Sequence, residues 1–163
     1  MQTEVYLGLG SNLGDKRGNI ERAIERLREL SSELTVSGLY ETAPVGVTIQ
    51  PSFVNAVCGM WTGLSVFELL REIHGIQCEA GVRGAVLNGP RMLDIDILLF
   101  GNLVVDLPHL KVPHPRMTER EFVLRPLVEV APGVVHTVAK KTAAELLADL
   151  VDTTLDPTGR SNR

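Results

Sequence analysis

Two aspartates, Asp94 and Asp96, stand one residue apart directly after the segment Gly89-Pro90-Arg91. Alternate side chains of a β-strand point to the same face, so a strand here would hold both carboxylates on one side. Because apolar residues follow at positions 97–100, we expect a central strand, where two unpaired acids are costly. Magnesium binds a few carboxylates together with water and phosphate oxygens. The pair therefore predicts a magnesium site for the phosphates of a nucleotide.

Basic residues occur on both sides of this acid pair in the sequence. Arg83 and Arg91 precede it, and His114 and Arg120 follow in a later loop. Guanidinium groups bind phosphate oxygens in pairs and neutralise the charge on a transferred phosphoryl group. Taken singly, each of these residues is more often a surface charge, and the acids alone could belong to a solvent-facing strand. As a set they favour an enzyme of phosphoryl-type transfer.

Asn55 is a polar residue within the apolar segment 53–61. A buried amide needs hydrogen-bond partners, and its donors and acceptor lie in one plane, like the edge of a flat heterocycle. Phe53 points to the same side of the strand and could stack on such a ring. The alternative is an amide whose hydrogen bonds are satisfied within the protein.

A glycine-rich segment, Gly8-Leu9-Gly10-Ser11-Asn12-Leu13-Gly14, lies near the N-terminus. Its spacing matches neither the dinucleotide-binding fingerprint nor a Walker loop. We interpret it as a tight strand-to-helix turn, with Ser11 or Asn12 capping the helix that follows.

The elements that must position these residues follow the order β-α-β-β-α-β. Strands are predicted at residues 4–9, 34–40, 53–61 and 93–100, and amphipathic helices at 15–30 and 66–77. A long irregular loop at 78–91, an apolar segment at 122–130 and a last helix at 142–150 complete the chain. This order predicts an α+β fold, a ferredoxin-like α/β sandwich with a mainly antiparallel sheet, helices on one face and long catalytic loops.

The composition is that of one globular domain. The chain has 163 residues, 44% of them hydrophobic and 22% charged, and we predict a single domain over residues 1–151 with a loosely ordered tail over 152–163. The net charge of −4 and the 4% aromatic content disfavour nucleic-acid binding. No segment predicts a membrane helix or a signal peptide, and two cysteines make no disulfide framework. We expect a cytoplasmic monomer that binds small molecules.

Several separated motifs of the chain resemble the 6-hydroxymethyl-7,8-dihydropterin pyrophosphokinase family. They occur in the family's order and extend from about residue 5 to 132: Gly10-Ser11-Asn12-Leu13-Gly14, Tyr40-Glu41-Thr42-Ala43-Pro44, Phe53-Val54-Asn55-Ala56, Gly89-Pro90-Arg91-Met92-Leu93-Asp94-Ile95-Asp96-Ile97-Leu98, Val112-Pro113-His114-Pro115 and Phe122-Val123-Leu124-Arg125-Pro126-Leu127. The resemblance implies a ferredoxin-like sandwich. It also implies transfer of the pyrophosphoryl group of ATP to the hydroxymethyl oxygen of the pterin, with release of AMP, in folate biosynthesis.

The resemblance also implies a role for individual residues. Asp94 and Asp96 would hold two magnesium ions, and Arg91 and Arg83 would act with them in catalysis. The residues implied for the pterin are Thr42, Val45, Phe53, Asn55 and Phe122. The residues implied for ATP are Arg83, Arg91, Ile97, His114 and Arg120.

The segment 81–89 departs from the pattern of the family. Gly81-Val82-Arg83 is one residue shorter than the usual Gly-Arg-x-Arg, and Leu87-Asn88 replaces Arg-Trp. Gln77, His109 and Lys111 also replace commoner residues. Each lost charge-assisted contact is worth about 1.5–3 kcal/mol, so we expect weakened or slower ATP handling. The alternative function is a pterin- or nucleotide-binding homologue with weakened or lost catalysis.

Overall fold

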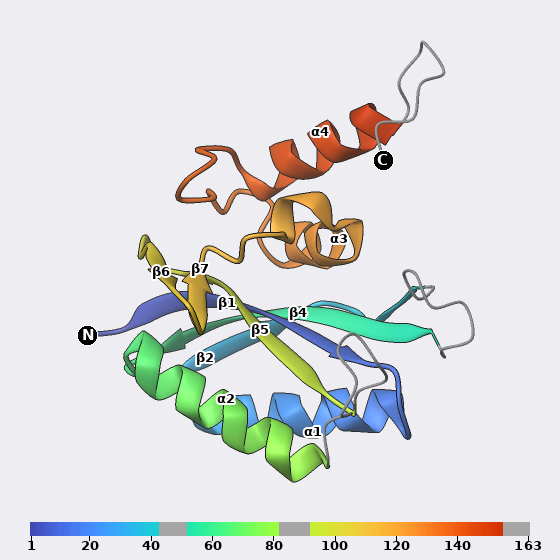
Figure 1. Cartoon of the computed structure of the whole chain (residues 1–163), viewed down its shortest axis with the longest axis vertical. Coiled ribbons are helices and arrows are strands. Elements are labelled where there is room, and N and C mark those ends of the chain that lie inside the picture. The colour runs from blue at the N-terminus through green and yellow to red at the C-terminus, as the bar shows by residue number, and fades with distance from the viewer. Residues whose placement is uncertain (43–51, 82–91, 155–163) are drawn as a thin grey trace.

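The computed structural model describes residues 1–42, 52–81 and 92–154 (Figure 1). Its elements in chain order are β1 (Thr3–Ser11), α1 (Lys16–Glu29), β2 (Glu33–Val36), β3 (Tyr40–Thr42), β4 (Phe53–Thr62), α2 (Val66–Ala80), β5 (Asp94–Phe100), β6 (Val105–Leu107), β7 (Leu110–Val112), η1 (Met117–Glu119), α3 (Glu121–Val130) and α4 (Ala143–Thr154). The predicted strand 34–40 is two strands, β2 and β3, separated by residues 37–39. Helix α4 extends past residue 151, where we placed the end of the domain. None of the helices in these ranges has the length and apolar character needed to cross a bilayer.

The main sheet has the strand order β2-β4-β1-β5, with β3 also paired to β4, and every pairing is antiparallel. Strands β6 and β7 form a separate hairpin. With helix α1 between β1 and β2, and α2 between β4 and β5, this topology confirms the predicted ferredoxin-like fold. Strand β1 lies between β4 and β5 along most of its length, so residues of these two strands face each other across β1.

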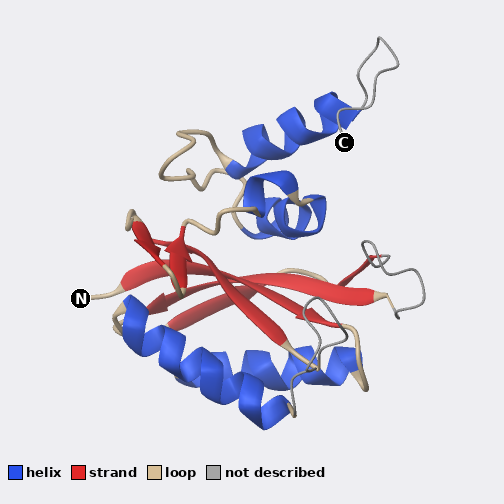
Figure 2. Ribbon diagram, viewed as in Figure 1, coloured by secondary structure: helices blue, strands red, loops and turns tan. Residues whose placement is uncertain are grey.

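Helices cover both faces of the sheet (Figures 1 and 2). On one face α1 and α2 pack residues such as Ile20 and Ile73 against Leu7 and Leu9 of β1. On the other face α3 and α4 pack against a second apolar cluster. Our expectation of helices on one face holds for α1 and α2 only. The segment 122–130 is helical in spite of Pro126, because three of its apolar side chains are buried against the sheet: Val123, Leu124 and Leu127.

Strand β5 lies at the edge of the main sheet, so the predicted central position is wrong. Its apolar sequence reflects the two covered faces: Ile95 and Ile97 belong to the cluster under α1 and α2, and Leu98 to the cluster under α3 and α4. The backbone groups on the outer edge have partners from other elements. Ile95 N donates to Gln77 Oε1 of α2 at 2.8 Å, and His114 N donates to Leu98 O at 3.0 Å.

The turn from β1 into α1 is capped by a residue that we did not predict. Asp15 is the N-cap, and its side chain accepts a hydrogen bond from Gly18 N at 3.1 Å. Ser11 instead accepts from Asn19 Nδ2 at 3.2 Å. Gly14 has a φ of 70°, which explains a glycine in this turn.

A buried histidine organises the loop between α3 and α4. His136 is 7% exposed, and its Nδ1 accepts hydrogen bonds from Ala139 N at 3.0 Å and Val138 N at 3.2 Å. Burial lowers the pKa of His136. The neutral ring is therefore the form that this loop requires, because a protonated Nδ1 cannot accept.

We predict that His136 makes stability depend on pH. The folded-state pKa lies below that of the unfolded chain, so the unfolded chain binds more protons between the two values. This contribution is fully present above about pH 6.5 and is lost as the pH falls below it. His136→Ala should lower the free energy of unfolding at pH 7.5 by about 1–3 kcal/mol, because two N–H groups lose their acceptor.

The matched control is His136→Asn, whose Oδ1 can replace Nδ1 as acceptor but does not titrate. Urea unfolding of the chain and both variants from pH 7.5 to 5 measures the effect. A wild-type pH slope equal to that of His136→Asn would show that His136 is not the responsible group.

Candidate functional site

A cross-strand row of residues joins the acid pair to the candidate heterocycle site. Asp94 of β5 is paired with Gly10 of β1, Gly10 with Asn55 of β4, and Asn55 with Tyr40 of β3. Residues directly opposite each other in a sheet point to the same face. Asp94 and Asn55 therefore share a face, and the residue between them has no side chain.

The next row repeats this arrangement two residues away. Asp96 is paired with Gly8, and Gly8 with Val57. Val57 belongs to the apolar cluster under α3 and α4, which identifies the face on which both carboxylates and Asn55 lie. Glycines at alternate positions of β1 thus form the floor of a strip, with the acids on one side and the amide on the other. We call it the glycine strip, formed by Gly8 and Gly10.

Gly10 is in close contact with the side chains on β4. A Cβ at this position would lie 3.2 Å from Asn55 Oδ1 and 3.7 Å from Phe53 Cδ1. Gly8 lies within the predicted strand 4–9, but our placement of Gly10 in the turn after that strand is wrong, because Gly10 also belongs to β1. Their spacing of two, within a run of β-forming residues, is the signal that could have identified them as strand residues on one face.

Three of the residues implied for the pterin lie together at the end of β3 and β4. Asn55 is 6% exposed and donates from Nδ2 to Thr42 Oγ1 at 2.8 Å. Thr42 is itself paired with Phe53. Phe122 lies in the first turn of α3, half-buried, with the guanidinium carbon of Arg120 5.6 Å from its ring centroid. Val45 lies outside the described residues.

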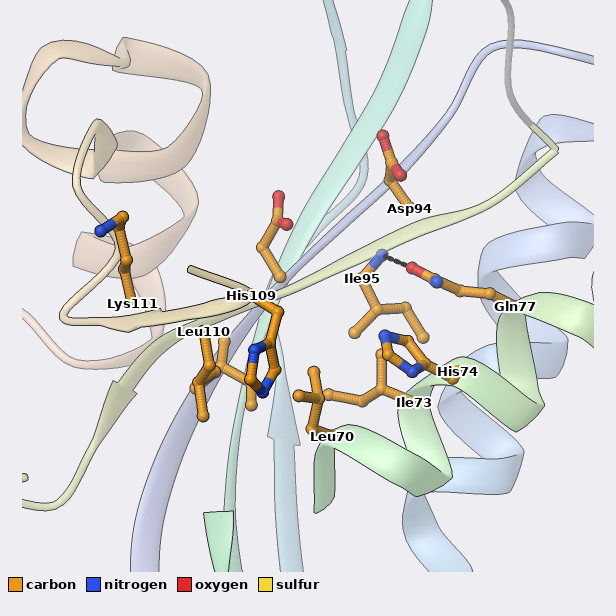
Figure 3. Close-up of a pocket in the computed structure, with 11 residues that line it drawn as sticks. Leu70, Ile73, His74, Gln77, Asp94, Ile95, His109, Leu110 and Lys111 are labelled. Carbon is orange, nitrogen blue, oxygen red and sulfur yellow. Dashed lines mark hydrogen bonds between the residues drawn. The ribbon is translucent and has the colours of Figure 1, made fainter. Parts of the chain in front are cut away.

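The acid pair borders a cavity of about 290 Å³ between α2, β5 and the β6–β7 hairpin (Figure 3). Because β5 is an edge strand, residues from both of its faces reach this space. Figure 3 shows Asp94 on one side of the strand and Ile95 on the other, toward α2. Asp94 is half-buried and Asp96 exposed, so the acids are more accessible than we predicted.

The cavity has an apolar wall and a polar rim. The apolar side chains are Leu70, Ile73, Ile95, Ile97 and Leu110, and the polar ones, besides the acids, are His74, Gln77, His109 and Lys111. Ile97, which the resemblance implies for ATP, lines this cavity. Leu70, His74 and Gln77 were not predicted as site residues, although their spacing of four and three places them on one side of a helix.

The charges of Asp96, Arg120 and Arg116 act on the side chain of His114. Burial lowers the pKa of His114, Arg120 and Arg116 lower it further, and only the carboxylate of Asp96 raises it. The ring is therefore neutral at pH 7. Its Nδ1 accepts from Arg116 N at 3.2 Å, which assigns the proton to Nε2. An Nε2–H donor beside a carboxylate and a guanidinium can bind a phosphate oxygen.

The donors available for a metal are few. Within the described ranges no three His, Cys, Asp or Glu residues gather as a possible metal site. Two carboxylates on one strand face fit magnesium, which takes its remaining ligands from water and from the oxygens of a bound phosphate. Arg83 and Arg91, the other predicted residues of this region, lie outside the described residues.

Comparison with known proteins finds one family over most of the chain. The family model of 7,8-dihydro-6-hydroxymethylpterin-pyrophosphokinase (HPPK) matches residues 6–132. The 2-amino-4-hydroxy-6-hydroxymethyldihydropteridine pyrophosphokinase of Pseudomonas aeruginosa is 44% identical over 136 residues, covering 82% of this chain and 84% of that protein. The enzyme of the same name from Aquifex aeolicus is 41% identical over 141 residues, covering 86% and 88%.

Longer proteins contain a similar region. The folic acid synthesis protein fol1 of Schizosaccharomyces pombe is 42% identical over 147 residues, which are 89% of this chain and 20% of that protein. The chain thus spans about a fifth of the length of this relative. A crystal structure of Plasmodium falciparum HPPK-DHPS aligns with a TM-score of 0.75 at 16% identity, covering 100% of this chain and 46% of that one. At this identity the likeness supports the fold.

We predict that a methyl group on the glycine strip is not tolerated at Gly10. Asn55 is buried and hydrogen-bonded to Thr42, so it cannot move away from a new Cβ without loss. Gly10→Ala should lower the free energy of unfolding by about 1–3 kcal/mol, the usual cost of overpacking.

Gly75→Ala is the matched control, because a Cβ built on that helical glycine has nothing within 4 Å apart from its chain neighbours and the backbone of its own helix. It should raise stability by about 0.5–1 kcal/mol. Urea unfolding measures both variants. If Gly10→Ala were as stable as the unmodified chain, the contact with Asn55 would not restrict this position.

Proposed function

The chain belongs to the 7,8-dihydro-6-hydroxymethylpterin-pyrophosphokinase family, and we propose that it transfers the pyrophosphoryl group of ATP to 6-hydroxymethyl-7,8-dihydropterin in folate biosynthesis. The observation that carries this proposal is the cross-strand row of Asp94, Gly10 and Asn55. It puts a carboxylate for a metal–phosphate group and an amide for a heterocycle on one sheet face, separated by one strand without a side chain.

We propose that the pterin binds over the end of β4. Asn55 and Thr42 would bind the polar edge of the ring, with Val45 beside it. Phe53 and Phe122 would stack on its two faces, one from the sheet and one from α3. The existing hydrogen bond from Asn55 to Thr42 holds the amide plane in one orientation before the ligand arrives.

ATP would occupy the cavity beside β5. Its apolar wall, which includes Ile97 and Leu110, suits the flat face of a base. Asp94 and Asp96 would hold two magnesium ions, which supply positive charge for the phosphate oxygens when bound. His114 and Arg120, with Arg83 and Arg91, would bind other phosphate oxygens and keep the chain of phosphates in one position.

In the reaction the hydroxymethyl oxygen attacks the β-phosphorus of ATP. The bond from that phosphorus to the oxygen bridging the α- and β-phosphates breaks, AMP leaves with the bridging oxygen, and the hydroxyl proton is released. The residues named above align the two reactants and stabilise the charge on the phosphoryl oxygens. We propose that a monomer does this, with residues 1–151 as its domain.

AMP formation from ATP and the dihydropterin with magnesium tests this proposal. A homologue that only binds its ligands would take up the dihydropterin and a non-hydrolysable ATP analogue in calorimetry but would release no AMP. The described residues contain no feature that favours this alternative over the enzyme.

We predict that Asp94→Asn combined with Asp96→Asn lowers turnover by about 10³-fold or more, because the phosphates lose their metal. The fold should remain, since asparagine has the same shape and one repulsion between like charges disappears. AMP release measures turnover, and urea unfolding checks the fold.

Asp149→Asn is the control for this prediction. Asp149 is an exposed acid of α4 that pairs with Lys141 at 2.6 Å, so its loss should leave turnover unchanged. Most of the activity surviving in the double variant would show that the two strand acids are ordinary surface residues.

We predict that Asn55→Ala raises the KM for the dihydropterin about tenfold, because polar groups of the ring lose their partners. The KM for ATP should stay unchanged. Steady-state kinetics measures both constants, with Asn102→Ala, an exposed residue after β5, as control. A large loss of thermal stability with an unchanged dihydropterin KM would identify Asn55 as a structural amide.

A further inference from the structure

The proposed pterin site is built from two separate parts of the fold. Thr42, Phe53 and Asn55 lie on the sheet, whereas Phe122 lies on α3. A ring can be held between two aromatic side chains only if the helix and the sheet keep a constant separation. The contacts between α3 and β3 therefore decide whether the site is preformed.

Glu129 near the end of α3 connects the helix to the sheet. Tyr40 Oη donates to Glu129 Oε1 at 2.5 Å, and Gly38 N donates to Glu129 Oε2 at 2.9 Å. Each carboxylate oxygen thus binds a different residue of the segment that leads into Thr42. Tyr40 is in turn paired with Asn55 across β3 and β4. We call this arrangement the Glu129 clamp, formed by Glu129, Tyr40 and Gly38.

The protonation states of Glu129 and Tyr40 favour strong hydrogen bonds. The hydrogen bond from Tyr40 lowers the pKa of Glu129, and the one from Gly38 N lowers it further. The same bond to Glu129 raises the pKa of Tyr40. At pH 7 the carboxylate is therefore ionised and the phenol protonated, which is the combination that makes short charge-assisted bonds.

The helix transmits this restraint to the aromatic residue. Phe122 and Glu129 are seven residues apart, close to two turns, so they lie on the same side of α3. Phe122 also packs on the apolar cluster that contains Leu124 and Leu127. Both residues belong to the ten-residue helix α3, so a fixed position at Glu129 limits where Phe122 can lie.

We propose that Glu129 is a positioning residue for pterin binding, which acts through Tyr40 and Gly38 by holding strand β3 at a set distance from α3. The inference rests on the proposed function. It assigns a role to Tyr40, which the sequence motif contains but which the site itself does not use. Glu129 is exposed, and a solvent-exposed hydrogen bond contributes little net stability, so the main effect of the clamp should appear in the affinity for the pterin.

The test compares Glu129→Ala, Glu129→Gln and Tyr40→Phe with the unmodified chain. Calorimetry gives the Kd of 6-hydroxymethyl-7,8-dihydropterin in the presence of magnesium and a non-hydrolysable ATP analogue, and the Kd of the analogue alone. Glu129→Ala should weaken dihydropterin binding about tenfold. Glu129→Gln and Tyr40→Phe should weaken it about threefold, because each keeps one of the two hydrogen bonds. The Kd of the nucleotide analogue should change by less than about twofold in every variant.

A double variant shows whether the residues act as one unit. Tyr40→Phe added to Glu129→Ala should cause no further loss, because its partner oxygen is already absent. Asp149→Asn, which removes a comparable exposed carboxylate from α4, should not change the Kd of the dihydropterin. If Glu129→Ala does not fold, the near-isosteric variants Glu129→Gln and Tyr40→Phe decide the outcome.

Two results would overturn the inference. One is a dihydropterin Kd within about twofold of the unmodified chain in the Glu129 variants. The other is an equal loss of dihydropterin and nucleotide affinity, which would indicate a general structural effect. An unmodified chain that binds the dihydropterin but forms no AMP would contradict the proposed function, while the Kd comparison would still decide the role of Glu129. Absence of dihydropterin binding to the unmodified chain would contradict both.

Discussion

The contact of Asn55 and Phe53 with the backbone at Gly10 is the interaction on which the site depends. A small sheet has little room for a ligand on a face that α3 also covers. Because Gly8 and Gly10 have no side chains, no side chain of β1 separates the acids of β5 from the amide of β4. The polar ends of strands on both sides of β1 can therefore reach two ligands that lie next to each other.

The position of β5 at the edge of the sheet makes the two acids of the site accessible. An edge strand exposes backbone groups that need partners. Gln77 and His114 supply two of these partners, and both also belong to the surroundings of the acids. The edge thereby gives Asp94 and Asp96 access to solvent and ligand, while Ile95 and Ile97 remain in the core. The repulsion between two carboxylates on one face of an edge strand costs little free energy, because water and a cation can reach them.

Segment 81–89 departs from the pattern of the family, although relatives of the whole chain are named as enzymes. The Pseudomonas and Aquifex relatives, which match most of their own length, are named as pyrophosphokinases, and the chain shares their family. Residues 82–91, which include most of this segment, lie outside the described residues. Lys111, another departure from the family pattern, lines the cavity and pairs with Asp106.

The sequence by itself determined what depends on neighbouring residues. Hydrophobic periodicity predicted the order of strands and helices, alternation put Asp94 and Asp96 on one face, and an apolar context marked Asn55 as buried. Only the tertiary structure decided what depends on segments far apart in the chain: β5 at the edge, Gly10 between Asp94 and Asn55, and Glu129 bonded to Tyr40. Strand order and helix docking arise from packing of whole faces, and no local pattern of residues specifies which face meets which.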